Sequence, residues 1–391
     1  MNINRRVKNI LESTTLAITA KAKELKAKGI DVVNFAAGEP DFDTPDFIKK
    51  SAIEAIQKGF TKYTPSTGTV ELREAICRKF KNDNNLEYKP SQIVVSCGAK
   101  HCIYDLIQVL VDDNEEVIIP APYWVSYPEM VKLAGGMSKI IQTDANGHFK
   151  ITALQLKKAI SKKTKVLILN SPSNPTGMVY SKEELSALAE VCVENNIYVI
   201  SDEIYEKLIY TDEPYVSMAA LNKEIGKLTA TVNGVSKAYA MTGWRIGYLA
   251  AEQEIVNYIR KFKDHTTSNP ASISQVAALA ALSASEESIR AMKEEFEKRR
   301  NLMMSCLDKI SEISYIPPQG AFYVFCNISR LKMGSAAFAE KILNDVNVAL
   351  IPGDGFGADD YIRLSFATST ERIQEGIKRI GGWVKRSSKG Q

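Results

Sequence analysis

The chain has 391 residues, 45% of them hydrophobic and 25% charged, which is typical of a globular protein with a large and a smaller domain or two domains of similar size. The net charge of +4 is small, and no basic block is interleaved with aromatic residues, so nucleic acid is a poor candidate partner. No apolar run reaches membrane-spanning length, and the polar stretch 1–12 argues against a secretory signal.

Short apolar runs alternate with helical patterns through the middle of the chain. The strand-like runs are 93–95, 117–119, 166–169, 198–200, 228–232 and 246–251. A helical pattern over 101–111 follows the first run, and another over 181–195 opens with a capping box of Ser181 and Glu184. This alternation predicts an α/β domain with a mostly parallel sheet.

The pattern changes toward the C-terminus. A long charged helix is predicted over 285–305. Its solvated face is expected to contain Glu294, Glu295, Glu297, Lys298, Arg299 and Arg300. The runs 321–325, 348–351 and 361–366 then indicate strands of a smaller α+β unit.

Polar groups follow several predicted strands, and ligands of open α/β sheets bind beyond the carboxyl ends of strands. The segment 97–100 opens a helix whose backbone amides would suit a phosphate, although such turns are common. Asn174 lies in a proline-rich turn and is available to donate a hydrogen bond. Asp202 and Tyr205 follow the next strand, where the carboxylate could cap a helix or face a ligand with the phenol.

Lys237 lies in the aromatic and glycine-rich segment 231–248, with Ser236 before it and Arg245 eight residues later. Burial lowers the pKa of a lysine, and a neutral amine beside an anion-binding arginine suits a Schiff base with an aldehyde phosphate. A surface lysine is the commoner interpretation of a lone lysine, but these surroundings make it the weaker one. A pyridine aldehyde phosphate would also need a carboxylate at its ring nitrogen.

Six ordered motifs resemble the class I, aspartate aminotransferase-like, pyridoxal-phosphate enzymes of fold type I, and the resemblance runs from about Arg6 to Arg379. The motifs are Ala37-Gly38-Glu39-Pro40-Asp41-Phe42, Lys62-Tyr63-Thr64-Pro65, Ser173-Asn174-Pro175-Thr176-Gly177, Ser201-Asp202-Glu203-Ile204-Tyr205, Ser236-Lys237 with Gly243-Trp244-Arg245, and Arg363-Leu364-Ser365. We therefore expect a large cofactor-binding domain over 46–290, with a mostly parallel sheet flanked by helices. A small α+β domain would combine 1–45 with 291–391.

The resemblance implies cofactor contacts residue by residue. Lys237 would form the Schiff base with pyridoxal phosphate and carry the proton, and Asp202 would pair with the pyridine nitrogen. Tyr205 and Asn174 would contact the phenolic oxygen, and Trp124 would stack on the ring unless it is an ordinary core tryptophan. The phosphate would be held by Arg245, Ser236 and the amides of Gly98, Ala99 and Lys100.

The resemblance also implies which residues bind the substrate and which residue reaches a partner subunit. Arg363 would clamp the substrate α-carboxylate, because a planar guanidinium suits bidentate binding. Gly38 would add a backbone contact, and Trp124 and Asn174 would also touch the substrate. Tyr63 would reach the phosphate of a neighbouring subunit, so the resemblance implies a homodimer with a shared active site.

Two positions depart from the family pattern. The family often has a hydroxyl residue three positions before the lysine, and this chain has Gly234 there, so the phosphate would depend more on Ser236 and Arg245. Many members have a second glycine in the phosphate turn, where this chain has Ala99. A backbone contact tolerates alanine if its φ is negative.

Substrate choice is expected to depend on Lys100. Some relatives read a distal carboxylate with an arginine from the segment matching 261–274, which holds no arginine here. A bacterial subgroup uses a lysine in the phosphate turn, and Ser13 and Thr15 match its N-terminal polar contacts. A lysine that points to water is the alternative, although a cation at a helix N-terminus is disfavoured by about 0.3–1 kcal/mol.

We therefore expect an aminotransferase that moves an amino group from L-aspartate to 2-oxoglutarate. Prephenate, aromatic or alanine specificity is an alternative, as is a lyase of the same fold. A ligand-sensing regulator would need an added DNA-binding module, for which a family match starting within the first dozen residues leaves no room. Six scattered cysteines without a C-x-x-C pair or a histidine cluster argue against zinc and disulfides, and favour a cytoplasmic protein with reduced thiols.

Overall fold

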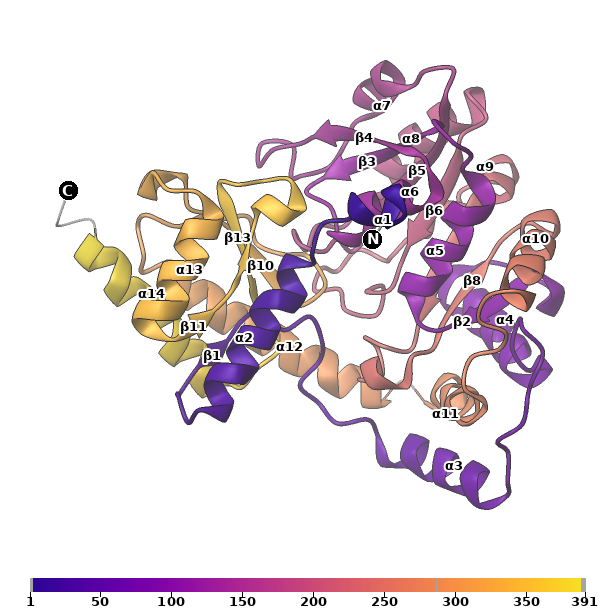
Figure 1. Ribbon diagram of the computed structural model, residues 1–391, viewed down its shortest axis with the longest axis horizontal. Coiled ribbons are helices and arrows are strands. Elements are labelled where there is room, and N and C mark those ends of the chain that lie inside the picture. Colours follow the sequence, from indigo (N-terminus) through magenta and orange to yellow (C-terminus); the bar gives the residue numbers. More distant parts are fainter. Residues whose placement is uncertain (1–2, 286, 388–391) are drawn as a thin grey trace.

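The computed structural model describes residues 3–285 and 287–387, so the first two residues of the polar N-terminal stretch and Glu286 of the predicted charged helix lie outside the described residues. A large sheet with helices on both faces lies beside a smaller sheet with its own helices (Figure 1). The predicted combination of an α/β part with a smaller α+β part is confirmed. No helix among the described residues is both long and apolar enough to cross a membrane.

The large sheet has the strand order β2-β8-β7-β6-β5-β3-β4. Its strands are β2 (Ile93–Ser96), β3 (Glu116–Ala121), β4 (Met137–Gln142), β5 (Thr164–Asn170), β6 (Tyr198–Asp202), β7 (Thr229–Gly234) and β8 (Gly247–Ala250). β8 is antiparallel to both neighbours, and the other neighbouring strands pair in parallel. β4 was not predicted, because this edge strand is mostly half-buried and lacks a continuous apolar run.

Helices cover both faces of the large sheet. One face carries α5 (Ala99–Leu110), α6 (Ser126–Ala134) and α10 (Gln253–Asp264); the other carries α4 (Val70–Asn84), α7 (Ala153–Ala159), α8 (Lys182–Glu194) and α9 (Lys223–Leu228). α11 (Ser272–Ser283) packs against α4 and α3 (Asp46–Gln57). Val117 and Ile119 belong to the core of one face and Ile118 to that of the other, which explains the continuous apolar runs.

The predicted start of α8 is confirmed. The amide of Glu184 donates to the hydroxyl of Ser181 at 3.2 Å, and the amide of Ser181 donates to the carboxylate of Glu184 at 2.8 Å. This reciprocal pair satisfies two amides that the first helical turn leaves without partners.

The smaller part is built from short strands. β12 (Ile351–Pro352), β13 (Tyr361–Ser365), β10 (Tyr323–Asn327) and β9 (Ser314–Tyr315) form an antiparallel sheet in that order. β1 (Val33–Asn34) pairs in parallel with β11 (Val348–Ala349). The single strand predicted over 348–351 is wrong, because β11 pairs with the N-terminal β1 whereas β12 pairs with β13.

The helices of this part are α2 (Thr14–Ala27), α12 (Glu287–Leu307), α13 (Ser335–Val346) and α14 (Thr370–Ser387). The short α1 (Arg5–Lys8) lies against α6 of the large part instead. Short 3-10 helices occur at Pro90–Gln92, Met218–Ala220, Thr242–Trp244, Ser329–Leu331 and Asp354–Phe356. The division into domains at 46 and 290 stays a prediction.

The solvated face predicted for the charged helix is wrong at Arg299, which is only 8% exposed. Its Nη1 donates to both carboxylate oxygens of Asp41, at 2.7 and 2.9 Å, and its Nε donates to Glu295 at 2.9 Å. The guanidinium also lies 5.0 Å from the ring centre of Phe42. Arg299 therefore ties the N-terminal segment to α12, a tertiary contact that helical periodicity does not reveal.

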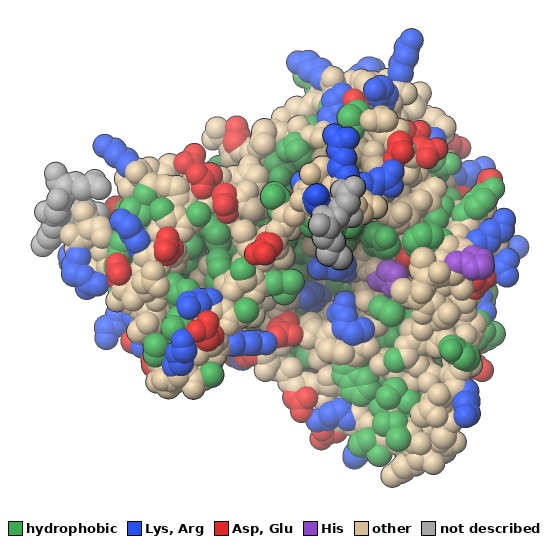
Figure 2. Space-filling model, viewed as in Figure 1, with side chains coloured by type: hydrophobic (Ala, Val, Ile, Leu, Met, Phe, Trp, Pro, Cys, Tyr) green, Lys and Arg blue, Asp and Glu red, His purple; other side chains and the backbone are tan. Residues whose placement is uncertain are grey.

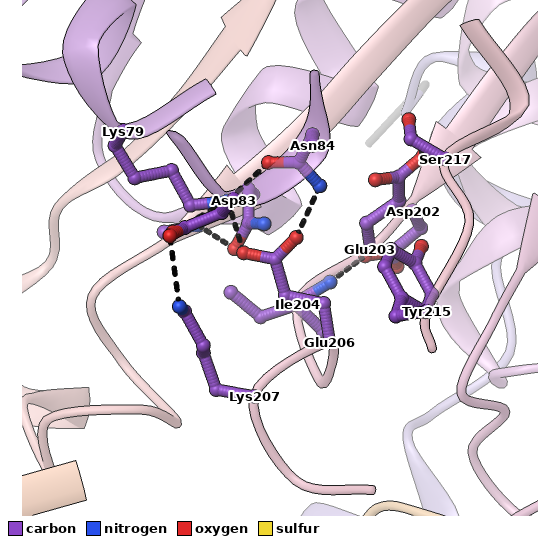
Figure 3. A network of polar contacts seen from close by, with 12 residues as sticks. Lys79, Asp83, Asn84, Asp202, Glu203, Ile204, Glu206, Lys207, Tyr215 and Ser217 are labelled. Carbon is purple, nitrogen blue, oxygen red and sulfur yellow. Dashed lines mark hydrogen bonds and ion pairs between the residues drawn. The ribbon is translucent and has the colours of Figure 1, made fainter. Parts of the chain in front are cut away.

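A polar network lies below the end of β6, largely buried (Figure 3). Lys79 of α4 forms an ion pair with Glu206, and Asn84 bridges the two: it accepts from Lys79 at 2.6 Å and donates to Glu206 at 2.6 Å. Asp83 lies 3.6 Å from Lys79 and 3.0 Å from Lys207. The network joins α4 to the segment that follows β6.

Glu203 lies beside this network (Figure 3), and no ion pair with it occurs among the described residues. Its Oε1 accepts from the hydroxyls of Ser201 and Ser217, at 2.8 and 2.7 Å, whereas its Oε2 has no hydrogen-bond partner among the described residues. Burial, with repulsion from Glu206, raises the pKa of Glu203 to about 7. Glu203 therefore binds a proton more readily in the folded chain than in the unfolded one.

Replacing Glu203 by glutamine should stabilise the fold in alkaline solution. Because the pKa is raised on folding, the stability contributed by the protonated carboxyl is complete below about pH 4.5 and is lost as the pH rises through about 7. Glu203→Gln removes this loss, and its free energy of unfolding at pH 8 should exceed that of the wild type by on the order of 2 kcal/mol. Urea unfolding at pH 5 and pH 8 measures the difference.

Glu206→Gln is the matched control and should be destabilising at both pH values, because it leaves the Lys79 ammonium buried without its carboxylate. Equal stability of Glu203→Gln and the wild type at pH 8 would contradict the assignment.

Candidate active site

A cavity of about 410 Å³ lies at the carboxyl edge of the large sheet and is also lined by residues of the smaller part. In Figure 2 the surface is hollowed between the two parts. Most residues singled out from the sequence line it: Ser13, Thr15, Gly38, Ala99, Lys100, Trp124, Asn174, Asp202, Tyr205, Ser236, Lys237, Arg245 and Arg363. Gly98 adjoins this set as the residue before α5, whereas Tyr63 lies outside the cavity.

Parallel pairing explains why these residues meet. Asn170 at the end of β5 is level with Asp202 at the end of β6, and Asp202 is level with Val232 of β7. The loops that carry Asn174 and Lys237 therefore leave the sheet at the same edge as Asp202. The Asn174 loop is held there because its amide donates to Asn170 Oδ1 at 2.7 Å.

Lys237 points toward the segment that follows β1. Its Nζ donates to the carbonyl oxygen of Gly38 at 2.6 Å. Burial lowers the pKa of Lys237 to about 8; the negative charge of Glu39 opposes this shift, and the positive charges of Arg363 and Arg245 add to it. About half of the amine is therefore neutral at pH 8, and a neutral amine can act as a nucleophile or a base.

Asp202 lines the same cavity and is only 4% exposed. The hydroxyl of Tyr127 donates to its Oδ2 at 2.6 Å, and the amide of Ile204 donates to its Oδ1 at 3.3 Å. Burial raises the pKa of Asp202 to about 6, although both hydrogen bonds and the charge of Lys237 act in the opposite direction. The carboxyl group is thus mostly ionised above pH 6 and can bind a cationic group of a ligand in the cavity.

Tyr127 was not among the residues predicted for the site. The available signal was its spacing: it stands three residues after Trp124 at the start of a helix, so the two rings can lie on one face. In the structure the rings meet edge to face, with centres 5.3 Å apart at 85°.

Gly98 and Arg245 form a cradle for an anion. Gly98 precedes α5 with φ of 92°, and a side chain there would collide with the Arg245 guanidinium. Arg245 is oriented by two backbone carbonyls, donating to Thr242 at 2.9 Å and to Cys97 at 3.1 Å. Ala99 is not among the residues with positive φ, so the condition for accepting alanine there is met.

Gly234, the other departure from the family pattern, has a local reason. A Cβ at this position would stand 3.0 Å from both the Cα of Gly247 and the carbonyl oxygen of Ile246. The close approach of β7 and β8 therefore leaves no ordinary room for a hydroxyl residue, and Ser236 is the hydroxyl that lines the cavity.

Arg363 of β13 is buried, with 2% of its surface exposed. It donates to Asn174 Oδ1 at 3.0 Å and to the carbonyl oxygen of Ala36 at 2.9 Å, and its Nε has no partner among the described residues. Its guanidinium lies 4.3 Å from the ring centre of Tyr323, whose hydroxyl is 2.9 Å from that of Tyr205. A fixed, incompletely satisfied guanidinium in a cavity can bind a carboxylate.

Lys100 reaches the cavity from the first turn of α5. Its Nζ lies 4.8 Å from the ring centre of Trp124, and burial, with the nearby charge of Arg245, lowers its pKa. Lys100 is also exposed, so its ammonium borders both the cavity and the solvent, and its role in substrate choice stays a prediction. Ser13 and Thr15, whose hydroxyls are 2.9 Å apart, line the same cavity from the start of α2.

Known proteins similar to this chain are aminotransferases. The family described as aminotransferase class I and II matches residues 30–380. An aspartate aminotransferase of Bacillus sp. YM-2 is 51% identical over 97% of this chain and 98% of its own length. A probable aspartate/prephenate aminotransferase of Aquifex aeolicus is 45% identical over 96% of both chains.

Among solved structures, the aspartate aminotransferase of Thermus thermophilus with maleate is 40% identical and superimposes with a TM-score of 0.94 over 98% of this chain and 99% of that one. The chain therefore belongs to the class I and II aminotransferase family. Enzymes of this family depend in general on pyridoxal phosphate.

Gly98→Ala should weaken both the fold and the cradle. The φ of 92° disfavours any L side chain, at a cost of about 1–3 kcal/mol, and the new methyl group would displace Arg245. We expect a lower melting temperature and loss of the stabilisation that inorganic phosphate gives the wild type, both measured by thermal unfolding.

Gly243→Ala is the control, because a Cβ there meets no atom within 4 Å. A Gly98→Ala protein that is stabilised by phosphate as strongly as the wild type would show that the cradle does not bind this anion.

Proposed function

We propose that the protein is an aspartate aminotransferase that binds pyridoxal phosphate at Lys237 and transfers the amino group of L-aspartate to 2-oxoglutarate. The convergence of Lys237, Asp202 and Arg363 in one cavity carries this proposal. The names of the relatives support aspartate as the donor. The structure of the Thermus thermophilus relative with maleate, a dicarboxylate, supports an acidic substrate.

The residues of the cavity fit the cofactor. Asp202 is a buried carboxylate suited to a pyridinium nitrogen, and Arg245 with Gly98 forms a cradle suited to a phosphate. Tyr205 and Asn174 would contact the phenolic oxygen, and Trp124 would cover the ring. When bound, pyridoxal phosphate supplies an aldehyde that condenses with amines and a protonated ring that withdraws electrons from the substrate Cα.

The chain's own residues then perform positioning and proton transfer. Arg363 binds the α-carboxylate of the amino acid, and Asn174 holds the guanidinium in place. Lys237, whose pKa of about 8 leaves part of it neutral near physiological pH, accepts the proton from the substrate Cα at its Nζ. Ser13 and Thr15 of the smaller part line the cavity and so cover part of it from water.

Lys100 is the residue we assign to substrate choice. Among the described residues, neither Lys100 nor Arg245 has a carboxylate within ion-pair distance at this end of the cavity. Because Arg245 is assigned to the phosphate, Lys100 is the cation that remains for the β-carboxylate of aspartate. Prephenate is the main alternative substrate, as the name of the Aquifex aeolicus relative indicates.

We further propose a cytoplasmic homodimer. Tyr63 is 92% exposed, and further exposed apolar residues lie along and near α3: Phe47, Ile53, Ile56, Phe60 and Val70. Figure 2 shows hydrophobic side chains gathered in this region, at the lower edge of the view. Such a patch is typical of a surface covered by a partner, and Tyr63 would then reach the partner's phosphate site. The six free cysteines are typical of a reducing compartment.

Aspartate alone should shift the visible absorbance band of the cofactor-loaded protein, and 2-oxoglutarate should restore it. Lys237→Ala should abolish both changes, whereas Lys132→Ala, outside the cavity, should keep them. Release of ammonia from aspartate without 2-oxoglutarate would instead indicate a lyase.

The rate at which the apoprotein captures pyridoxal phosphate should depend on pH. Because burial lowers the pKa of Lys237, this rate should rise with pH up to about 8 and level off above it.

Lys100→Ala should change the preference between amino donors. Loss of one charge-assisted contact should lower kcat/KM for aspartate about 10- to 100-fold relative to that for alanine. Lys23→Ala is the matched control, because Lys23 lines the mouth of the same cavity from α2. A change in the ratio for Lys23→Ala alone, or a preference for tyrosine over aspartate in the wild type, would contradict the assignment to Lys100.

A further inference from the structure

Tyr127 joins the two sides of the proposed cofactor site and has no assigned role. It lies in the first turn of α6, is 2% exposed and lines the cavity. Its ring packs edge to face against Trp124, and its hydroxyl donates to Asp202 Oδ2 at 2.6 Å. One residue thus contacts both the ring-stacking tryptophan and the buried carboxylate.

The Asp202 carboxylate has few other sources of stabilisation. The Ile204 amide donates to its Oδ1 at a longer 3.3 Å, and no salt bridge to Asp202 occurs among the described residues. Burial favours the protonated form, and the Tyr127 hydrogen bond is the largest influence in the opposite direction. Without the hydroxyl, Oδ2 would be buried and lack its donor.

Tyr127 is itself suited to act only as a donor. Burial, together with the charge of Asp202, raises its pKa well above the ordinary value of a phenol, so the hydroxyl keeps its proton at physiological pH. The edge-to-face contact with Trp124 also fixes the ring, which directs the hydroxyl at Oδ2 and leaves Oδ1 with the weaker Ile204 contact.

We infer that Tyr127 is a positioning residue that acts through Asp202: its hydroxyl keeps this carboxylate ionised and oriented toward the pyridine nitrogen of pyridoxal phosphate. This inference rests on the proposed function, because it requires that cofactor in the cavity. It assigns to α6 a role in cofactor binding that goes beyond carrying the stacking residue.

The test compares the affinity of apoprotein variants for pyridoxal phosphate at pH 7.5, measured by fluorescence titration. Tyr127→Phe should bind the cofactor about 10- to 100-fold more weakly than the wild type, as loss of a hydrogen bond to a charged group predicts. Tyr180→Phe is the control, because the buried Tyr180 hydroxyl accepts from the amide of Ile151 at 3.0 Å outside this cavity. It should bind as the wild type does.

The Asp202→Asn background separates this role from a merely structural one. If Tyr127 acts through the charge of Asp202, adding Tyr127→Phe to Asp202→Asn should weaken binding by less than about threefold further. An equal loss in both backgrounds, or wild-type affinity in Tyr127→Phe, would overturn the inference. A wild-type protein that does not bind pyridoxal phosphate would overturn the proposed function and the inference together.

Discussion

Parallel pairing of β5, β6 and β7 is the constraint on which the site depends. Parallel strands end at one edge of the sheet, and their hydrogen bonds fix which residues are level there. Asn170 and Asp202 are therefore neighbours regardless of the conformation of the loops that follow them. The Asn174 loop, Asp202 and the Lys237 loop can then converge without any contact between them in sequence. β8 is antiparallel to β7 and therefore begins at this edge, so Arg245, two residues before β8, lies beside the N-terminus of α5.

Burial determines the electrostatics of the cavity. The same removal from water raises the pKa of Asp202 and lowers those of Lys237 and Lys100, because it disfavours the charged form of each group. Specific contacts then moderate the effect: the Tyr127 hydroxyl favours the Asp202 carboxylate, and the charge of Glu39 favours the Lys237 ammonium. The cavity therefore offers a partly neutral amine and an ionised carboxylate near pH 8.

The segment from Ala36 to Phe42 connects the two parts of the molecule. Its Ala36 carbonyl holds Arg363, its Gly38 carbonyl accepts from Lys237, and its Asp41 is bound by Arg299 of α12. Glu39 also accepts from Thr242 of the loop after Lys237, at 2.7 Å. A movement of the smaller part relative to the large sheet would act directly on both the substrate-binding arginine and the amine.

Many of the strands and helices of this fold could be predicted from the sequence. Apolar runs buried on both faces predicted the central strands correctly, because a parallel sheet covered by helices needs apolar residues at every position. Ser181 and Glu184 marked the start of α8 because capping is a local interaction. The edge strand β4 and the division of 348–351 between two sheets were missed, since both depend on which distant strand is the partner.

By itself, the sequence determined most of the local elements and the chemical kinds of side chain available to the site: Asp202 at the end of β6, Lys237 and Arg245 in the loop between β7 and β8, and Arg363 within β13. Only the tertiary structure decided that Tyr127 bonds Asp202, that Arg299 is buried on Asp41, and that Lys100 faces the cavity beside Trp124. The physical reason is range. Helix caps and strand periodicity arise within a few residues, whereas burial and partner choice arise from segments that are distant in sequence and meet only in the folded chain.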